Sequence, residues 1–480
     1  MSGREYDCER RAETVYIPYP HWLNPGDNTW QIVAATLVGL MSLPGLAVLY
    51  GGLVQKKWAV NTMLMAFSGF SLVLIVWVLW AFNLSFGVPT HLGGSNTHSF
   101  FNNLIGNFHF ATSHYAEQNQ EVLPEGTLIP FHYNQATFMY FQVVFAAITP
   151  LLFLGSVIGR MKFKAWLVFV PLWITCVYSV NAFLIWGGGF FAQKGAVDYS
   201  GGYVIHLAAG VTGFVAAWVI GPRLARDRRH GVPNNLLMVS VGAGILWLGW
   251  NGFNGGDPFY AGADATSAVL NTNLATAAAL LTWMLMDMFF SKQKKATFLG
   301  AINGMIVGLV TITPGAGFVN GYGAMLEGLI ASAIVWVAWN YLSKVRPFSK
   351  VDDALGVVYT HGIAGLCGGL LVGFFADPGM IEYIGLGKAS PGFSVTGLFY
   401  SGSWHQEWEQ FLAAAWVIVF TAIASFILLW IVKLVIGLRE PDENLEIGDL
   451  AVHDEEAYPE ETFAERVGAS VGGSSEALET

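Results

Sequence analysis

The sequence contains one pattern twice, first as Asp198-Tyr-Ser-Gly-Gly-Tyr-Val-Ile-His206-Leu-Ala-Ala209-Gly210 and again as Asp353-Ala-Leu-Gly-Val-Val-Tyr-Thr-His361-Gly-Ile-Ala364-Gly365. In each copy an aspartate precedes a histidine by eight residues, and the histidine begins the same His-x-x-Ala-Gly. Both copies lie in apolar stretches, and each belongs to a unit of five such stretches. Because five is odd, the second unit is inverted, and inverted repeats place a substrate path at their interface near the midplane.

Apolar stretches long enough to cross a bilayer, which takes about 20 residues, recur along the chain. Eleven qualify: 29–52, 60–86, 133–157, 165–186, 200–220, 236–256, 267–290, 298–314, 319–342, 354–376 and 411–436. Charged residues are only 12% of the chain, against about a quarter in soluble proteins. The sequence predicts an all-α integral membrane protein with eleven transmembrane helices, built as an inverted five-plus-five repeat and a final eleventh helix.

Basic residues alternate between the loops in a way that predicts the orientation, because Lys and Arg accumulate on the cytoplasmic side. One set of loops holds Lys56, Lys57, Arg160, Lys162, Lys164, Arg223, Arg226, Arg228, Arg229, Lys292, Lys294, Lys295, Lys344, Arg346 and Lys350, and the other holds Lys194 and Lys388. We therefore expect a polar extracellular segment over residues 1–27, the membrane domain over 28–437 and an acidic cytoplasmic tail over 438–480. The predicted location is the cell membrane.

Of the eleven histidines, only His206 and His361 lie inside predicted spans with apolar residues on both sides. A lone buried histidine is usually a hydrogen-bonded core residue, but a matched pair on symmetric helices favours a pathway, because polar groups at that depth are costly. Desolvation disfavours the charged imidazole, so we expect both rings to be neutral near pH 7. Such a lining suits a small polar molecule such as ammonia and could relay a proton. Neither span offers a third ligand, so a metal site is disfavoured, and no cofactor motif is present.

These segments resemble the ammonium transporter family, the bacterial, plant and fungal transporters related to the Rh proteins. The similarity covers about 28–460, and residues 44–61 look particularly like the plant type-two branch. It is carried by both histidine segments and by Ile185-Trp186-Gly-Gly-Gly189, Gly249-Trp250-Asn-Gly-Phe253-Asn254-Gly-Gly256 and Gly437-Leu-Arg439.

The resemblance implies a homotrimer with one pore per subunit and a recruitment site at the outer mouth. Trp186 and Phe141 match the aromatic residues of that mouth, where an ammonium cation can lie over a ring face. Phe145 and Phe253 match a stacked pair that closes the pore above the histidines. Asp198 matches the buried aspartate below the mouth, although a helix cap is the alternative role for it.

Two parts of the sequence depart from the family pattern or extend it. Asp257 stands where many relatives have serine, so it either places a carboxylate beside the recruited cation or turns away into the outer loop with Pro258. In the tail, Gly448, Asp449, His453 and Tyr458 match a regulatory segment, and Asp454 stands where glycine is usual. That segment implies a tail folded over the inner pore mouths and the binding of a PII-class regulatory protein.

The predicted function is recruitment of ammonium, loss of its proton near the phenylalanine pair, and passage of ammonia along the histidines, with or without the proton. The expected partners are ammonium or ammonia (with methylammonium as an analogue) and the lipid bilayer; no nucleic acid is expected. An Rh-like channel for neutral gas would share the histidines without needing the tryptophan mouth, and an ammonium sensor would use the tail for signalling. A membrane enzyme is disfavoured, because no nucleophile motif, metal set or cofactor loop accompanies the acidic and histidine residues.

Overall fold

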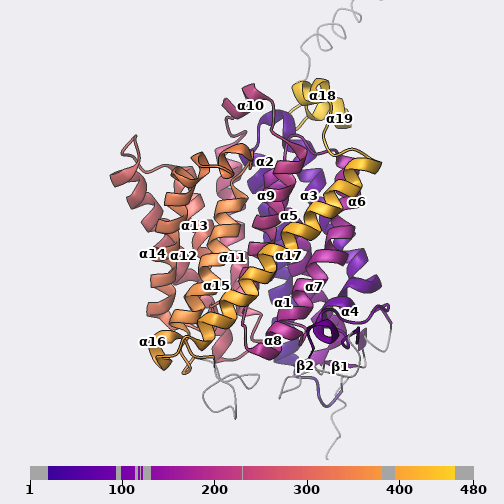
Figure 1. Cartoon of the computed structure of the whole chain (residues 1–480), viewed down its shortest axis with the longest axis vertical. Helices are drawn as coiled ribbons and strands as arrows, with labels where there is room; N and C mark the ends of the chain where they lie inside the picture. The colour runs from indigo at the N-terminus through magenta and orange to yellow at the C-terminus, as the bar shows by residue number, and fades with distance from the viewer. Residues whose placement is uncertain are drawn as a thin grey trace, which may run out of the picture.

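The computed structural model of this chain describes residues 20–92, 99–113, 117–118, 120–122, 131–229, 231–380 and 395–459. Most of the predicted 1–27 segment and the last part of the predicted 438–480 tail fall outside these residues. The described residues form a bundle of helices, with a small antiparallel ladder of β1 (Glu121–Val122) and β2 (Phe131–Asn134) at one end (Figure 1).

Ten helices among the described residues are long and apolar enough to cross a membrane. They cover Pro25–Leu53, Lys56–Phe86, Gln135–Val157, Phe163–Lys194, Gly202–Ile220, Leu236–Gly255, Ala263–Phe290, Gly321–Lys344, Val358–Phe375 and His405–Val435. A further apolar helix, Phe298–Ile312, stands where the eighth span was predicted, but its 15 residues are fewer than the others have. The all-helical architecture with many spans is confirmed, and the count of eleven stays a prediction.

The helices are named here by their position in the chain. Those before residue 230 are α1 (Pro25–Leu40), α2 (Ala47–Leu53), α3 (Ala59–Val76), α4 (Phe82–Phe86), α5 (Gln135–Val157), α6 (Phe163–Trp173), α7 (Ser179–Ile185), α8 (Phe190–Lys194), α9 (Ala208–Ile220) and α10 (Ala225–Arg229). Those after it are α11 (Leu236–Gly255), α12 (Ala263–Phe290), α13 (Phe298–Ile312), α14 (Gly321–Asn340), α15 (Ala364–Phe375), α16 (Leu398–Ser401), α17 (His405–Val435), α18 (Asp442–Ile447) and α19 (Asp449–His453).

Several spans contain one turn of π-helix, which is uncommon and is frequently found at functional sites. These turns are Met41–Leu46, Trp77–Ala81, Ile174–Tyr178, Gly202–Leu207 and Val358–Ile363. The last two contain His206 as their fifth residue and His361 as their fourth, and they run directly into α9 and α15. Both copies of the repeated sequence therefore adopt the same unusual backbone.

The repeated aspartates hold the starts of the two histidine helices. Asp198 Oδ2 accepts hydrogen bonds from the backbone N–H groups of Tyr203 and Val204, each at 2.9 Å. Asp353 Oδ2 accepts from the N–H of Val358 at 2.8 Å, and its Oδ1 accepts from the Ser156 hydroxyl at 2.8 Å. Each carboxylate thus satisfies backbone donors that the first turn of a helix leaves unpaired.

Glycines let the two histidine helices touch backbone to backbone. A Cβ added at Gly210 would lie 2.2 Å from Gly362 Cα, and one added at Gly365 would lie 2.5 Å from Gly202 O and 3.1 Å from His206 Cβ. Gly202 meets Gly365, and Gly210, further along its own helix, meets Gly362, which comes earlier in the other helix. The two helices therefore run in opposite directions where they cross, as expected for an inverted repeat.

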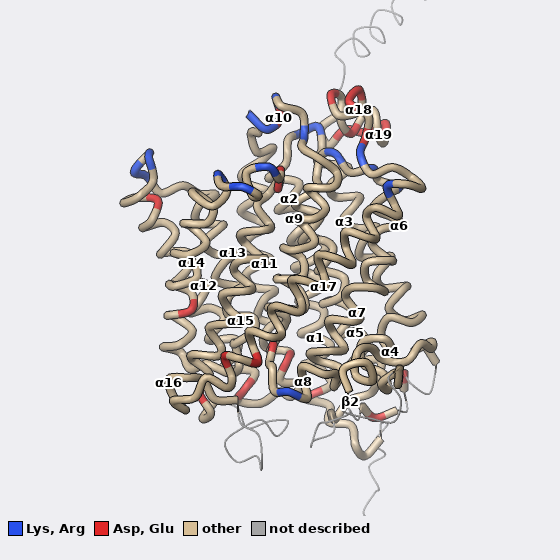
Figure 2. The backbone as a smooth tube through the Cα atoms, in the orientation of Figure 1, with Lys and Arg blue, Asp and Glu red and all other residues tan. Residues whose placement is uncertain are grey.

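Charge is distributed unevenly along the bundle. Figure 2 shows Lys and Arg gathered at the end that carries α10, α18 and α19, which we call the basic end. The opposite end, which holds β1 and β2, has far fewer of them. Helix α5 lies at the centre of the bundle, because 94% of the residues in its most apolar stretch are buried. Only 22% of those in the most apolar stretch of α12 are buried, so α12 lies at the periphery.

Candidate functional site

His206 and His361 meet in the middle of the bundle. Their Nδ1 atoms are 3.2 Å apart, and their rings lie 5.3 Å apart between centroids with 25° between planes. Both side chains are buried. A hydrogen bond between two Nδ1 atoms needs one donor and one acceptor, so neutral rings must be different tautomers. One Nε2 then donates and the other accepts, which together match both hydrogen-bonding roles of a molecule such as ammonia.

Trp250 of α11 covers one face of this pair. Its ring stacks on His206 at 5.3 Å with 17° between planes, and its Nε1 donates to the Thr313 hydroxyl at 2.9 Å. The sequence did not indicate a role for Trp250. The only signal for it was its place three residues before Phe253, one helical turn along the same face.

Phe145 of α5 and Phe253 of α11 form the stacked pair that the resemblance implied, with centroids 4.4 Å apart and 27° between planes. Phe253 also lies 5.9 Å from His206, between ring centroids. On the side away from Phe253, the Phe145 ring lies 4.8 Å from the Phe141 ring and 6.2 Å from the Trp186 ring, between centroids. The aromatic and imidazole residues singled out from the sequence therefore form one continuous row of rings, which we call the aromatic file. It consists of Trp186, Phe141, Phe145, Phe253, His206 and His361.

The end of the file that holds Trp186 lies next to two acidic residues. Trp186 Nε1 donates to the carbonyl oxygen of Asp198 at 2.6 Å. Burial raises the pKa of the Asp198 carboxyl to about 6, and hydrogen bonds from the backbone partly offset this. Asp257 lies at the same end of the file, because the preceding residue, Gly256, packs against Phe141. A Cβ added at Gly256 would lie 2.3 Å from the Phe141 ring. Burial raises the pKa of Asp257 well above its usual value, and the charge of Asp198 raises it further.

The four predicted tail residues each lie against residues 56–61 at the basic end, where α3 begins. Gly448 has a positive φ of 91°, and any Cβ there would lie 2.2 Å from Lys57 O. Asp449 accepts from the N–H groups of Val60 and Asn61 at 2.7 and 2.9 Å. His453 Nε2 and Asn61 Nδ2 are 2.8 Å apart. The Lys56 ammonium lies over the ring of the fourth residue, Tyr458, with Nζ 5.7 Å from the ring centroid.

Asp449 acts as the N-cap of α3 from a distant part of the sequence, because Trp58 at that position provides no side-chain hydrogen bond. We expect Asp449→Ala to lower the free energy that holds the tail in place by about 0.5–2 kcal/mol, the usual cost of losing a cap. Hydrogen exchange of the 442–453 backbone should become faster. Glu443→Ala, at an exposed position in α18, is the control and should leave exchange unchanged. Equal exchange in both variants would contradict the capping role.

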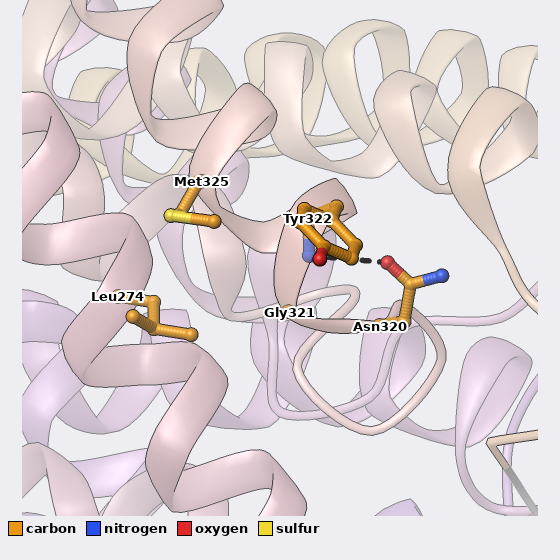
Figure 3. A pocket seen from close by; sticks show the side chains of 5 residues that line it. All are labelled: Leu274, Asn320, Gly321, Tyr322 and Met325. Atoms are coloured by element: carbon orange, nitrogen blue, oxygen red, sulfur yellow. Dashed lines mark hydrogen bonds between the residues drawn. The ribbon is translucent and has the colours of Figure 1, made fainter.

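A surface pocket opens elsewhere, between α12 and α14. It is lined by Leu274, Asn320, Gly321, Tyr322 and Met325, and the Tyr322 N–H donates to Asn320 Oδ1 at its edge (Figure 3). These residues include none that the sequence singled out, so the pocket is separate from the aromatic file. Among the described residues, no group of three or more His, Cys, Asp or Glu side chains is placed to hold a metal ion.

Comparison with known proteins identifies the family and the fold. The family model described as "Ammonium Transporter Family" matches residues 29–458. "Ammonium transporter 3 member 2" of Oryza sativa subsp. japonica is 47% identical over 444 residues, which cover 91% of this chain and 90% of that protein. "Ammonium transporter 2" of Arabidopsis thaliana is 43% identical, covering 92% and 89%. The crystal structure of Saccharomyces cerevisiae Mep2 superposes with a TM-score of 0.73 at 28% identity, covering 92% and 93%.

Proposed function

Because this chain belongs to the ammonium transporter family, we propose that it recruits ammonium at the Trp186 mouth, removes a proton, and conducts ammonia through a pore lined by His206 and His361. The observation that carries the proposal is the continuous file of rings from Trp186 through Phe145 and Phe253 to the histidine pair. Transport rather than catalysis is proposed, since the relatives are named as transporters.

The chemistry of the file favours a neutral molecule in its middle. Phenylalanine rings cannot replace the hydration shell of a cation, and burying an unpaired charge is far more costly than burying a small neutral polar group. Trp186, by contrast, can hold ammonium over its ring face. We therefore place the loss of the proton between the mouth and the Phe145–Phe253 stack. Beyond the stack, the two imidazoles provide a donor and an acceptor for ammonia.

The proton released from ammonium either returns to the outer solution or follows through the histidines. An ammonium concentration jump on proteoliposomes adsorbed to a supported membrane separates the two, because only the second route carries current. Uptake of labelled methylammonium, measured on the same vesicles, reports flux. Absence of both uptake and current from correctly folded protein would refute the transport function.

The wider assembly is proposed from charge and exposure. The basic end faces the cytoplasm, so the amino terminus lies outside and the tail inside, in the cell membrane. The eleven spans, with Phe298–Ile312 as the eighth, form the inverted five-plus-five repeat and a last helix. Apolar side chains exposed on α12 and α14, such as Leu281 and Leu329, suit contacts between the subunits of a homotrimer or with lipid. The docked tail is a candidate surface for a PII-class regulator.

The role of the mouth can be tested by substitution of Trp186. Trp186→Leu removes the ring face, which contributes about 0.5–1 kcal/mol at a partly exposed site, so the half-saturating ammonium concentration should rise about 2–5-fold. Trp186→Phe keeps a ring but loses the hydrogen bond to Asp198, so it should recover part of the affinity. Concentration dependence of uptake that is unchanged in the leucine variant would count against recruitment there.

A further inference from the structure

Two carboxyl groups are buried close together at the mouth, without a basic partner. Asp198 and Asp257 are 4% and 5% exposed, and the salt bridges found in the described part of the chain involve neither of them. The charge of Asp198 disfavours ionisation of Asp257. Two buried like charges that interact resist ionising together, so the pair favours a state in which one carboxyl keeps a proton.

The groups around the pair are hydroxyls and one further carboxyl, and none of them is basic. The Ser200 hydroxyl lies against Asp257, and the Tyr178 hydroxyl lies within electrostatic reach of both carboxyls. Tyr133 of β2 also faces Asp257, and it interacts in turn with Tyr260 and with Asp27 of α1. No positive charge from these elements stabilises an ionised Asp257.

The two aspartates differ in how many donors serve them. Asp198 Oδ2 accepts from two backbone N–H groups, as the cap of the histidine helix requires, while its Oδ1 is buried without a partner among the described residues. Asp257 Oδ2 is buried and, over the residues that the structure describes, has no hydrogen-bond partner; the same is true of the Tyr178 hydroxyl. Leaving a buried acceptor without a donor is unfavourable, so this place suits a ligand that brings both N–H donors and positive charge. Ammonium has both.

We propose that Asp257 is a site where ammonium and a proton exchange, a role that rests on the proposed function. In the empty site the Asp257 carboxyl holds a proton. Arrival of ammonium breaks that O–H bond and releases the proton to outer water, leaving a carboxylate–ammonium pair. The carboxylate then takes a proton from the ammonium: an N–H bond breaks, an O–H bond forms, and neutral ammonia enters the pore. Each cycle converts one external ammonium into ammonia and one external proton, and it restores the neutral carboxyl.

The exchange predicts a pH dependence of definite sign. Where the Asp257 carboxyl is mainly protonated, ammonium must displace a proton, so its half-saturating concentration falls as the external pH rises. In the limit the change is about tenfold for each pH unit, since one proton is exchanged per cation. Asp198 contributes less to this pH dependence than Asp257 does, because hydrogen bonds from backbone N–H groups already favour its carboxylate form.

Two measurements test the exchange. In lightly buffered detergent solution, ammonium chloride added to the purified protein should release about one proton per chain, read by a pH dye, and sodium chloride should release none. Asp257→Asn and Asp257→Ser should release less than half as much, Asp257→Glu should recover the release, and Asp264→Asn, in the first turn of α12, should behave as the unmodified chain. In proteoliposomes, the serine variant should show a flatter dependence of half-saturation on pH.

The outcomes separate this proposal from the transport function. Proton release that is equal in the unmodified, asparagine and serine proteins would overturn the exchange at Asp257, whether or not flux is seen. Absence of flux from the unmodified protein would instead overturn the proposed function, while the dye measurement would still decide about the binding site. If the asparagine variant fails to fold, as judged by its elution on gel filtration, the serine and glutamate variants decide.

Discussion

Replacing His206 and His361 together by leucine should reduce ammonium flux about 30-fold or more while the bundle remains folded. The expectation follows from the position of the two rings, which are buried and present hydrogen-bonding nitrogens beyond the Phe145–Phe253 stack. Leucine leaves ammonia without a partner there, and burying such a group unpaired costs about 2 kcal/mol or more. Folding should tolerate the change, because the helix starts are held by Asp198 and Asp353 and not by the imidazoles.

The single variants sharpen this expectation. His206→Leu also removes the ring on which Trp250 stacks, so it should be more damaging than His361→Leu. His405→Leu is the control, since His405 is an exposed histidine at the start of α17 and should leave flux unchanged. Labelled methylammonium uptake into proteoliposomes is the measurement. If the double variant transports as well as the control, the histidines do not line the path.

The pairing of the histidines was predictable because the chain repeats itself. Two copies of one pattern in an inverted arrangement must meet at the axis that relates them, so the sequence alone indicated that His206 and His361 would be neighbours. The aspartate eight residues earlier was equally visible, and helix capping was the alternative considered for Asp198. The structure adds that Asp353 holds its own helix start in the same way.

Other features had no signal in the sequence. The π-helical turns Gly202–Leu207 and Val358–Ile363 depend on one extra residue per turn, which apolar periodicity does not reveal in a span that is apolar on all sides. The last helix begins at His405 rather than near residue 411. Its first turns are polar, but Gln406 and Gln410 bond to backbone groups at Gly195, Val197 and Gly369, so tertiary contacts extend the helix beyond its apolar part.

The aromatic file shows a third limit. Composition and periodicity could not distinguish Phe145 and Phe253 from the many phenylalanines that face lipid, and only the resemblance singled them out. Trp250 was overlooked for the same reason, since an apolar helix gives no indication of which ring will stack on a histidine. A file that passes between α5 and α11 depends on contacts between distant segments, and these become visible only once the helices are packed.

Gly210→Ala should lower flux about tenfold or more by forcing apart the two helices that carry the histidines. The new Cβ would lie 2.2 Å from Gly362 Cα and 2.4 Å from Gly362 N, and these backbone atoms cannot move without shifting the turn that holds His361. Gly365→Ala acts from the other side, on Gly202 O and on His206 Cβ. Overpacking of this kind costs about 1–3 kcal/mol, which lowers the melting temperature, and it also breaks the 3.2 Å contact between the rings.

The control for this prediction lies in the same bundle. Gly244 of α11 has no atom within 4 Å of an added Cβ, so Gly244→Ala tests the general effect of adding a methyl group to a span, and it should leave flux unchanged. Gly362→Ala is intermediate, since its closest contact is Gly210 Cα at 3.2 Å. Flux should therefore fall in the order Gly244, Gly362 and Gly210, following the tightness of each contact. If the Gly210 and Gly244 variants transport equally, separation of the histidine helices does not control the pore, because Gly210 makes the contact between those helices and Gly244 does not.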